Sequence, residues 1–395
     1  MDKEEAEQVE PLRPPDLNQE SDRSATRLEL FFDLAFVLFV ARCADILAKD
    51  ETWHGALIFA AVLSIGWWAW ASTTLYANRF DTDDAVFRLL TLTAMAGVVV
   101  MAAAVDKIDG AAGRWFAIGY VLIRLALIAG YLRVWRHVPE ARSTARLYLI
   151  GHGMGAAFWL VSLAVPTPAR YWLWGAGVLA DVVWPTAAAR LKDAVPLHLE
   201  HLPERFGLFV ILVLGESVAA VVTGLHDAGW DAAVLVTAGC AFVSAAGLWW
   251  IYFDLSGGAA KRRLTTEGDV TKHGVHDFYV YVHLPLAVSL AAVAVGLEHA
   301  VLHGADDHLS AGTRGVLGIA TAGYLFSAAL MQAHLGRRVR GTLLWPGAGV
   351  PLVLLIVLLD LSPVTTMAWL AALLAAGVLT GFQLHRAGEV RTAKV

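Results

Sequence analysis

The sequence predicts an all-α, polytopic integral membrane protein, and three observations support this prediction. Of the 395 residues, 57% are hydrophobic and only 16% are charged, whereas soluble domains carry about 25% charged residues. Apolar runs of the length that crosses a bilayer as a helix, about 20 residues, recur from residue 28 onward. The chain also has 15 tryptophans, a residue enriched at membrane surfaces. This composition excludes a soluble globular domain, a disordered chain and a disulfide-rich scaffold.

The first 27 residues differ from the rest of the chain. They hold eight acids and four bases and lack any apolar run, which excludes a cleavable signal peptide. We expect a solvated, disordered cytoplasmic tail.

Twelve apolar runs follow this tail, and each is long enough to be a membrane-spanning helix. The predicted spans are 28–48, 53–77, 86–105, 114–134, 146–165, 170–189, 205–225, 230–254, 276–300, 313–333, 341–360 and 363–385.

The lysines and arginines between these spans predict the topology. Of the 30 basic residues, 23 fall in segments on the same side as the N-terminus, five fall on the opposite side, and Arg42 and Arg124 lie inside spans. Because cytoplasmic loops carry an excess of positive charge, both termini are predicted to be cytoplasmic. The small net charge of −5 gives no reason to expect a nucleic-acid partner.

Two similar six-helix halves are also predicted. The first and seventh spans both open on an acid followed by a Phe-rich run, and Gly66-Trp67-Trp68 resembles Gly247-Leu-Trp249-Trp250. With six helices each, the halves would be parallel repeats about an axis along the membrane normal; a chance likeness of aromatic helix starts is the alternative. The expected division is a tail 1–27, a first half 28–190, a linker 191–204, a second half 205–386 and a tail 387–395.

Three charged residues lie near the middle of predicted spans, where a charge costs about 2.5–3.5 kcal/mol on insertion scales. They are Arg124 in the fourth span, Asp181 in the sixth and Glu216 in the seventh. We expect Arg124 to pair with Glu216 or Asp181. Such a pair either clamps helices together or lines a polar path.

Further charges lie near the cytoplasmic ends of the first and seventh spans. Glu29 and Asp33 are four residues apart and therefore share a helix face, and Arg205 lies about 20° around the helix from Glu216. With the neighbouring Glu204, these residues extend the candidate path. Arg42 lies on the helix face opposite Asp33 and is expected to pair with Asp45, three residues further along.

The histidines offer weaker candidates. His198 and His201 precede Glu204 at helical spacing, but Pro196 and Pro203 interrupt the segment, so a solvated break is favoured over a metal site. His283 stands before Pro285, which lacks an N–H and frees a backbone carbonyl, so a polar site or a satisfied core histidine is expected there. No metal site and no cofactor are predicted.

Three motifs resemble the signatures of the bacterial low temperature requirement protein A family. They begin at Glu29-Leu-Phe-Phe-Asp33, His201-Leu-Pro-Glu-Arg-Phe-Gly207 and Tyr281-Val-His283-Leu-Pro285. By position the matched residues are Glu29, Asp33, His201, Glu204, Arg205, Gly207, Gly215, Glu216 and His283. The resemblance implies a multi-pass bacterial membrane protein associated with growth in the cold, and implies no particular substrate. Pro203 departs from the pattern, where alanine is expected.

A shorter likeness covers seven residues. Arg27-x-x-x-Phe31-Phe32-Asp33 is similar to the opening of a family of organellar and bacterial potassium channels, with Phe32 in place of serine.

The sequence favours a transporter or channel for a small solute or ion, with a polar path between the two halves. An intramembrane enzyme acting on a lipid-like substrate through His198, His201, Glu204 and Glu216 is one alternative. A non-transporting scaffold or sensor of membrane state is the other. The chain shows no nucleophile–base pair and no phosphate-binding glycine loop.

The predicted topology can be tested on the segment 255–275, which carries Lys261, Arg262, Arg263 and Lys272. With Cys43 and Cys240 replaced by serine, an Ala260→Cys variant is expected to resist an impermeant maleimide in intact cells and to react after lysis. Labelling from outside the intact cell would contradict the topology.

Overall fold

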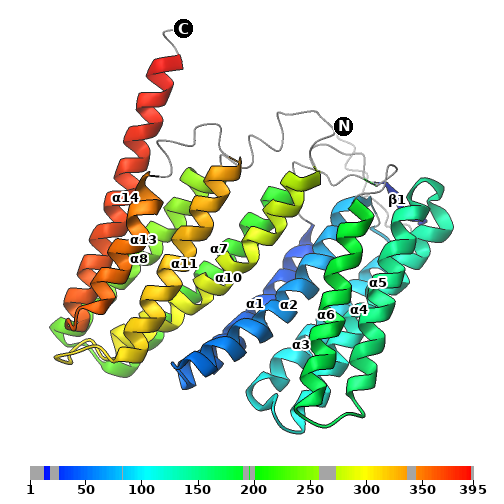
Figure 1. Cartoon of the computed structure of the whole chain (residues 1–395), viewed down its shortest axis with the longest axis horizontal. Coiled ribbons are helices and arrows are strands. Elements are labelled where there is room, and N and C mark those ends of the chain that lie inside the picture. The colour runs from blue at the N-terminus through cyan, green and yellow to red at the C-terminus, as the bar shows by residue number, and fades with distance from the viewer. Residues whose placement is uncertain are drawn as a thin grey trace, which may run out of the picture. The chain divides into compact units, whose positions relative to one another are not determined.

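The computed structural model describes residues 13–17, 26–81, 83–189, 195, 201–257, 273–335 and 344–392, and nearly all of them are helical (Figure 1). Two short strands, β1 (Asp16–Leu17) and β2 (Phe80–Asp81), pair antiparallel. β1 comes from the N-terminal segment, and β2 directly follows a long helix.

Each of the twelve predicted spans coincides with one helix of the described chain. These are α1 (Arg27–Lys49), α2 (Trp53–Arg79), α3 (Ala85–Ala104), α4 (Ala112–His137), α5 (Arg142–Ser162), α6 (Ala169–Ala189), α7 (His201–Ala228), α8 (Ala232–Trp250), α10 (His273–Leu302), α11 (Ala311–Leu335), α13 (Leu344–Leu358) and α14 (Pro363–Thr392). A π-helix, Ile251–Gly257, extends α8, and short 3₁₀ turns, Val105–Lys107 and Pro139–Ala141, follow α3 and α4.

Eight of the described helices are long and apolar enough to cross a membrane, and Gly347–Leu358 within α13 is apolar but shorter. The chain is therefore a multi-span helical membrane protein. That all twelve helices cross the bilayer remains a prediction.

The start of α7 differs from the sequence prediction. The helix begins at His201, four residues earlier than expected, and includes Pro203. The sequence prediction reads Pro203 as a helix breaker. Proline is nevertheless tolerated in the first turn of a helix, where its missing N–H would have no intrahelical acceptor.

The chain divides into two compact units. Unit 1 comprises Met1–Phe39 and Ile65–Leu202, and unit 2 comprises Val40–Ser64 and Pro203–Val395. The boundaries fall inside α1 and α2 and after the second residue of α7, so α1 and α2 each contribute several turns to both units and α7 lies almost wholly in unit 2.

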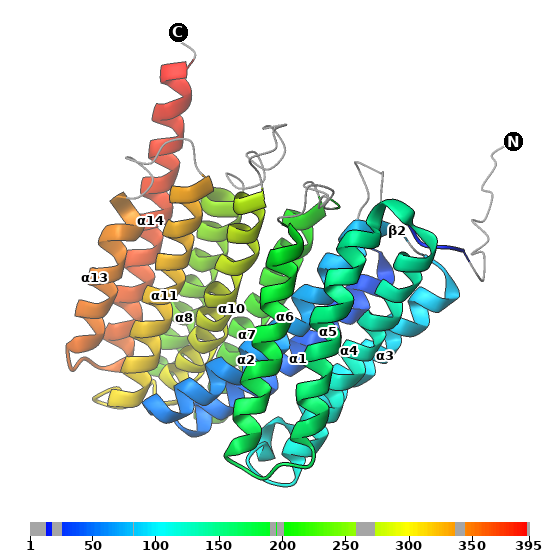
Figure 2. The same cartoon turned by 45° about the vertical axis from the view of Figure 1, so that its right-hand side comes forward.

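Unit 1 is built from consecutive helices that pack side by side, α3 on α4, α4 on α5 and α5 on α6 (Figures 1 and 2). Its parts of α1 and α2 meet where Phe39 packs on Gly66, a position at which a Cβ would clash with the phenyl ring. The core is aromatic, and Phe39 also contacts Phe116 of α4 at 6.3 Å between ring centroids.

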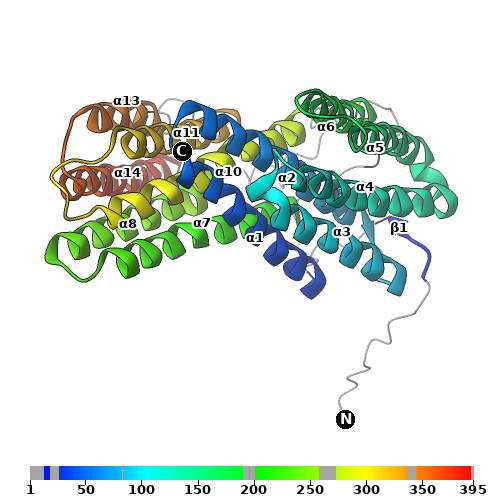
Figure 3. The same ribbon diagram turned by 90° about the horizontal axis from the view of Figure 1, so that it is seen from below.

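Unit 2 is arranged differently, because five of its helices pack in a closed ring. α8 packs on α10, α10 on α11, α11 on α13, α13 on α14, and α14 returns to α8 (Figure 3). Glu51, on the loop between α1 and α2, stabilises the start of α11, accepting hydrogen bonds from Thr313 at 2.9 Å and Ser310 at 3.4 Å.

The outer faces of the helices carry large apolar side chains, as a lipid environment requires. Trp172, Trp53 and Leu57 are 81%, 72% and 69% exposed.

Hydroxyl groups within helices donate to the carbonyl one turn earlier, as Ser72 does to Trp68 at 2.6 Å and Thr91 to Phe87 at 3.0 Å. Such bonds satisfy polar groups where no water is available.

The packing of α3 against α4 depends on two facing glycines. A Cβ at Gly97 would lie 2.5 Å from the Gly119 carbonyl oxygen, and a Cβ at Gly119 would lie 2.5 Å from that of Gly97. We expect Gly97→Ala to destabilise the protein by about 1–3 kcal/mol, because the two helices must separate. Thermal unfolding in detergent measures this effect.

Gly153→Ala on α5 is the matched control, because nothing lies within 4 Å of a Cβ at that position. Helix propensity favours alanine over glycine by up to about 1 kcal/mol, so this variant should unfold at or above the wild-type temperature. A Gly97→Ala variant as stable as Gly153→Ala would refute the close crossing.

Candidate functional site

A buried ion pair joins α4 to α6 inside unit 1. Arg124 and Asp181 are both 0% exposed, and the Arg124 Nε lies 3.0 Å from the Asp181 Oδ2. Of the two acids that the sequence offered to Arg124, the structure pairs it with Asp181, whereas Glu216 belongs to unit 2.

Two further side chains complete the coordination of the Asp181 carboxylate. The Tyr120 hydroxyl donates to Oδ2 at 2.8 Å, and the His152 Nδ1 lies 2.9 Å from Oδ1. Tyr120 stands one helical turn before Arg124, whose guanidinium lies over the tyrosine ring at 4.4 Å. We refer to Arg124, Asp181, Tyr120 and His152 as the buried polar network.

The network fixes the protonation of His152 at one nitrogen. An ionised carboxylate can only accept hydrogen bonds, so the Nδ1 of His152 carries the proton that faces Asp181. The other nitrogen, Nε2, is buried and has no hydrogen-bond partner among the described residues. His152 can therefore bind a further partner without losing Asp181.

Small and aromatic residues make room for the network. A Cβ at Gly155 would lie 2.7 Å from both carboxylate oxygens of Asp181, so only glycine lets α5 approach α6 here. Trp159, one turn further along α5, stacks on Tyr120 at 4.2 Å and on Trp174 at 4.9 Å. These rings exclude water from one side of the ion pair.

A second group of polar side chains lies on the His152 side of the network. Tyr131 stacks on Tyr148 at 4.6 Å, and its ring lies 5.7 Å from that of His152. Arg79, at the end of α2, lies over the Tyr148 ring at 5.1 Å. The helical spacing from Arg124 to Tyr131 is seven residues, about 10 Å along α4.

Arg79 is incompletely compensated. It is 7% exposed, and within the described part of the chain no carboxylate pairs with it. It contacts the Tyr148 ring, interacts with the Tyr131 hydroxyl and makes a long hydrogen bond of 3.5 Å to the Leu75 carbonyl. A cation–π contact contributes about 0.5–2 kcal/mol, whereas burial of a charge costs several kcal/mol.

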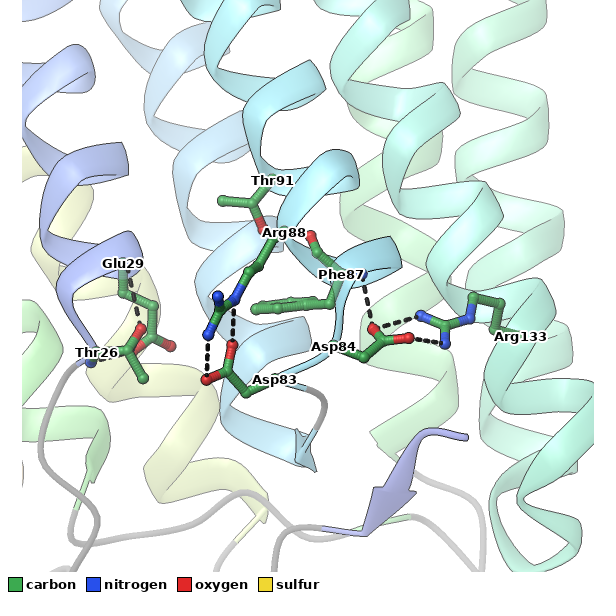
Figure 4. Close-up of polar contacts among 8 residues, drawn as sticks. All are labelled: Thr26, Glu29, Asp83, Asp84, Phe87, Arg88, Thr91 and Arg133. Atoms are coloured by element: carbon green, nitrogen blue, oxygen red, sulfur yellow. Dashed lines mark hydrogen bonds and ion pairs between the residues drawn. The ribbon is translucent and has the colours of Figure 1, made fainter. Parts of the chain in front are cut away.

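Glu29 and Asp33 were predicted to line the path. Both lie in unit 1, but their hydrogen bonds are to residues outside the buried polar network. Glu29 and Thr26 form a capping box at the start of α1 (Figure 4): the Thr26 amide donates to the Glu29 carboxylate at 2.8 Å, and the Glu29 amide donates to Thr26 Oγ1 at 3.3 Å. The buried Asp33 accepts a hydrogen bond from Trp70 Nε1 at 2.8 Å. These contacts give both acids a structural role.

Acids near the start of α3 are also engaged. Asp84 caps this helix by accepting from the Phe87 amide at 2.8 Å and binds Arg133 at 2.7 Å, and Asp83 binds Arg88 at 2.9 Å (Figure 4). Burial raises the pKa of Asp84, but the hydrogen bonds and charge of Arg133 and the Phe87 amide outweigh burial and lower it overall. The ionised Asp84 therefore stabilises unit 1 above the usual pKa of an aspartate, and this contribution is lost as the pH falls through its lowered pKa.

The remaining predicted residues belong to unit 2. Glu204 is exposed on the first turn of α7, Arg205 beside it is buried, and Glu216 is half-buried about three turns later. His283 is fully buried: its Nδ1 lies 2.6 Å from the Tyr279 carbonyl, and its Nε2 lies 2.9 Å from the Tyr252 hydroxyl. It is a satisfied core histidine, one of the two outcomes expected. Arg42 and Asp45 pair at 2.6 Å, as expected.

The predicted enzyme residues are only partly visible. His198 lies outside the described residues, as does the side chain of His201. The described residues contain no group of three or more His, Cys, Asp or Glu side chains able to hold a metal ion.

Sequence comparison gives two results. The family model for the bacterial low temperature requirement A protein matches residues 24–381. An uncharacterized protein of Rhizobium meliloti (strain 1021) is 28% identical over 293 residues, which cover 70% of this chain and 69% of the relative.

The ion pair predicts a specific pattern of rescue. Arg124→Leu leaves the buried Asp181 without its cation and is expected to cost about 3–5 kcal/mol, seen as poor yield and early thermal unfolding. Adding Asp181→Asn removes the uncompensated charge and should restore much of the stability. Adding Glu216→Gln instead should restore none, and equal rescue by both would contradict the assigned pair.

Proposed function

Because the chain belongs to the bacterial low temperature requirement A protein family and has the helices of a multi-span membrane protein, we propose that it is a transporter or channel for a small solute or ion. The path runs through the buried polar network of unit 1, where Arg124, Asp181 and His152 line it. The arrangement of Asp181 between a cation and a half-satisfied histidine is the observation that carries the proposal.

The energetics of the network support a functional role. A structural clamp between two membrane helices needs one hydrogen bond, which is worth about 0.6 kcal/mol on average in a membrane protein. Here a complete charge pair and two more polar side chains lie in a fully buried core. Ionisable groups at such positions commonly mark ion and proton pathways.

The chemistry of the network suits transient binding. Arg124 NH1 and His152 Nε2 are buried and lack hydrogen-bond partners among the described residues. They can bind a solute or take up a proton, and Asp181 keeps the two cationic groups in place while they do so. A scaffold would have no use for such exchangeable positions.

The proposal includes the architecture expected from the sequence. All twelve helices cross the plasma membrane of a bacterial cell, both termini lie in the cytoplasm, and the halves 28–190 and 205–386 are parallel repeats. In unit 2, Glu216 is a further candidate, because it is a half-buried acid and the only charged residue in the described stretch 206–225 of α7.

Flux measurements in proteoliposomes test this function. Vesicles that contain the wild type should dissipate imposed gradients of protons or small ions faster than protein-free vesicles. The stable double variant Arg124→Leu/Asp181→Asn should fall to the level of protein-free vesicles. Asp83→Asn is the matched control, because it removes the same charge from an exposed pair and should transport normally.

Glu216→Gln tests whether unit 2 contributes to the path. Loss of flux with normal folding would place Glu216 on it, and unchanged flux would leave the path to unit 1. A double variant of Arg124 and Asp181 that transports as well as the wild type would refute the proposal and favour a scaffold.

A further inference from the structure

We infer that Arg79, Tyr131 and His152 form a binding site for a small monovalent anion in unit 1. The inference rests on the proposed function in one respect, namely that the bound anion is the solute the protein moves. Binding itself can be tested without transport.

Three polar side chains from three helices lie around the Tyr148 ring. The Arg79 Nε comes from α2, the Tyr131 hydroxyl from α4 and the His152 Nε2 from α5, and each is buried without a hydrogen-bond partner among the described residues. Tyr148 holds them together, because its ring lies 5.1 Å from the Arg79 guanidinium, 4.6 Å from the Tyr131 ring and 5.8 Å from the His152 ring. The Arg79 guanidinium also lies close enough to the Tyr131 hydroxyl for the two groups to interact directly.

The chemistry of these groups selects an anion. A guanidinium offers only donors, and a tyrosine hydroxyl beside it is best used as a donor too. Nearby acids are already engaged: Asp84 with Arg133, Asp83 with Arg88, and Asp181 with Arg124. A cation would face Arg79 without a carboxylate to offset the repulsion.

Binding at His152 couples the anion to a proton. Because Nδ1–H points to Asp181, Nε2 can donate to an anion only when the imidazole carries a second proton. The titratable and charged groups that face His152 are Asp181 from α6, Tyr131 and Arg124 from α4, and Tyr148 from its own helix. The anion is thus expected to bind together with one proton.

The surroundings limit the size of the ligand. Tyr76 meets Tyr131 edge-on at 5.0 Å, and its other neighbours include Phe80 at 5.3 Å. Tyr76 also lines an apolar hollow between α2, α3 and α4, with Gly130 and Phe87. Because the hollow is apolar and includes none of Arg79, Tyr131 and His152, the room beside these three buried groups is small, and we expect an anion of the size of formate or a halide rather than a large carboxylate.

Equilibrium binding to the purified full chain in a neutral detergent tests the site. Sodium formate is titrated against sodium gluconate at equal ionic strength, with thermal unfolding or calorimetry as the readout. Formate should bind and stabilise the wild type, whereas gluconate should not. Tyr131→Phe keeps the ring stack and removes one hydroxyl, so it should weaken formate binding about tenfold. Arg79→Gln should abolish it.

Arg88→Gln is the control, because it also removes one positive charge near the cytoplasmic end but from an exposed pair; it should bind formate as the wild type does. Formate should bind more tightly at about pH 5.5 than at about pH 8. His152→Asn keeps an N–H donor toward Asp181 and should lose this pH dependence.

Several outcomes would overturn the site. The first is formate binding that neither Arg79→Gln nor Tyr131→Phe changes, and the second is equal stabilisation by formate and gluconate. The third is stabilisation only after addition of phosphatidylglycerol, which would indicate that the site binds a lipid headgroup. Formate binding without flux in proteoliposomes would leave the site standing and refute only the proposed function. Flux that survives without any formate binding would refute the site alone.

Discussion

The ion pair between Arg124 and Asp181 is the constraint from which the rest of unit 1 follows. Each charge alone would cost about 2.5–3.5 kcal/mol at mid-bilayer, so neither helix could keep its charge without the other. Pairing is not sufficient, because a buried carboxylate needs its remaining lone pairs satisfied. Tyr120 and His152 supply those hydrogen bonds. Gly155 leaves the space, and Trp159 closes the side next to Tyr120.

The sequence predicted the helices well and the network only in part. The long apolar runs locate every helix, whereas the helix ends differ from the predicted ends by up to seven residues. At α7 the difference arose from reading Pro203 as a helix breaker rather than as a first-turn residue. The depth of Arg124 and Asp181 suggested their pairing. It could not choose between Asp181 and Glu216, because depth along a helix does not reveal which helices are neighbours.

Tyr120 and His152 were missed for different reasons. Tyr120 could have been found, because it stands one turn before Arg124 on the same face of α4. His152 lies in a helix that is only weakly amphipathic, so the sequence does not show which of its faces packs on α6. The Thr26-x-x-Glu29 capping box was also visible in the sequence, and it explains Glu29 by local structure rather than by a pathway.

A comparison of two buried histidines shows why unit 1, rather than unit 2, carries the exchangeable groups. Both nitrogens of His283 are engaged, one by the Tyr279 carbonyl and the other by the Tyr252 hydroxyl. Among the residues that the structure describes, His152 hydrogen-bonds only to Asp181, and a buried polar atom without a partner costs about 1–3 kcal/mol. The same reasoning applies to Arg79, since the acids near it are committed to other arginines. A permanent carboxylate beside Arg79 would remove this cost but would also occupy the position for good. A site that must bind and release a charged solute needs a partner that can leave, so incomplete compensation is the condition for exchange rather than a defect of packing.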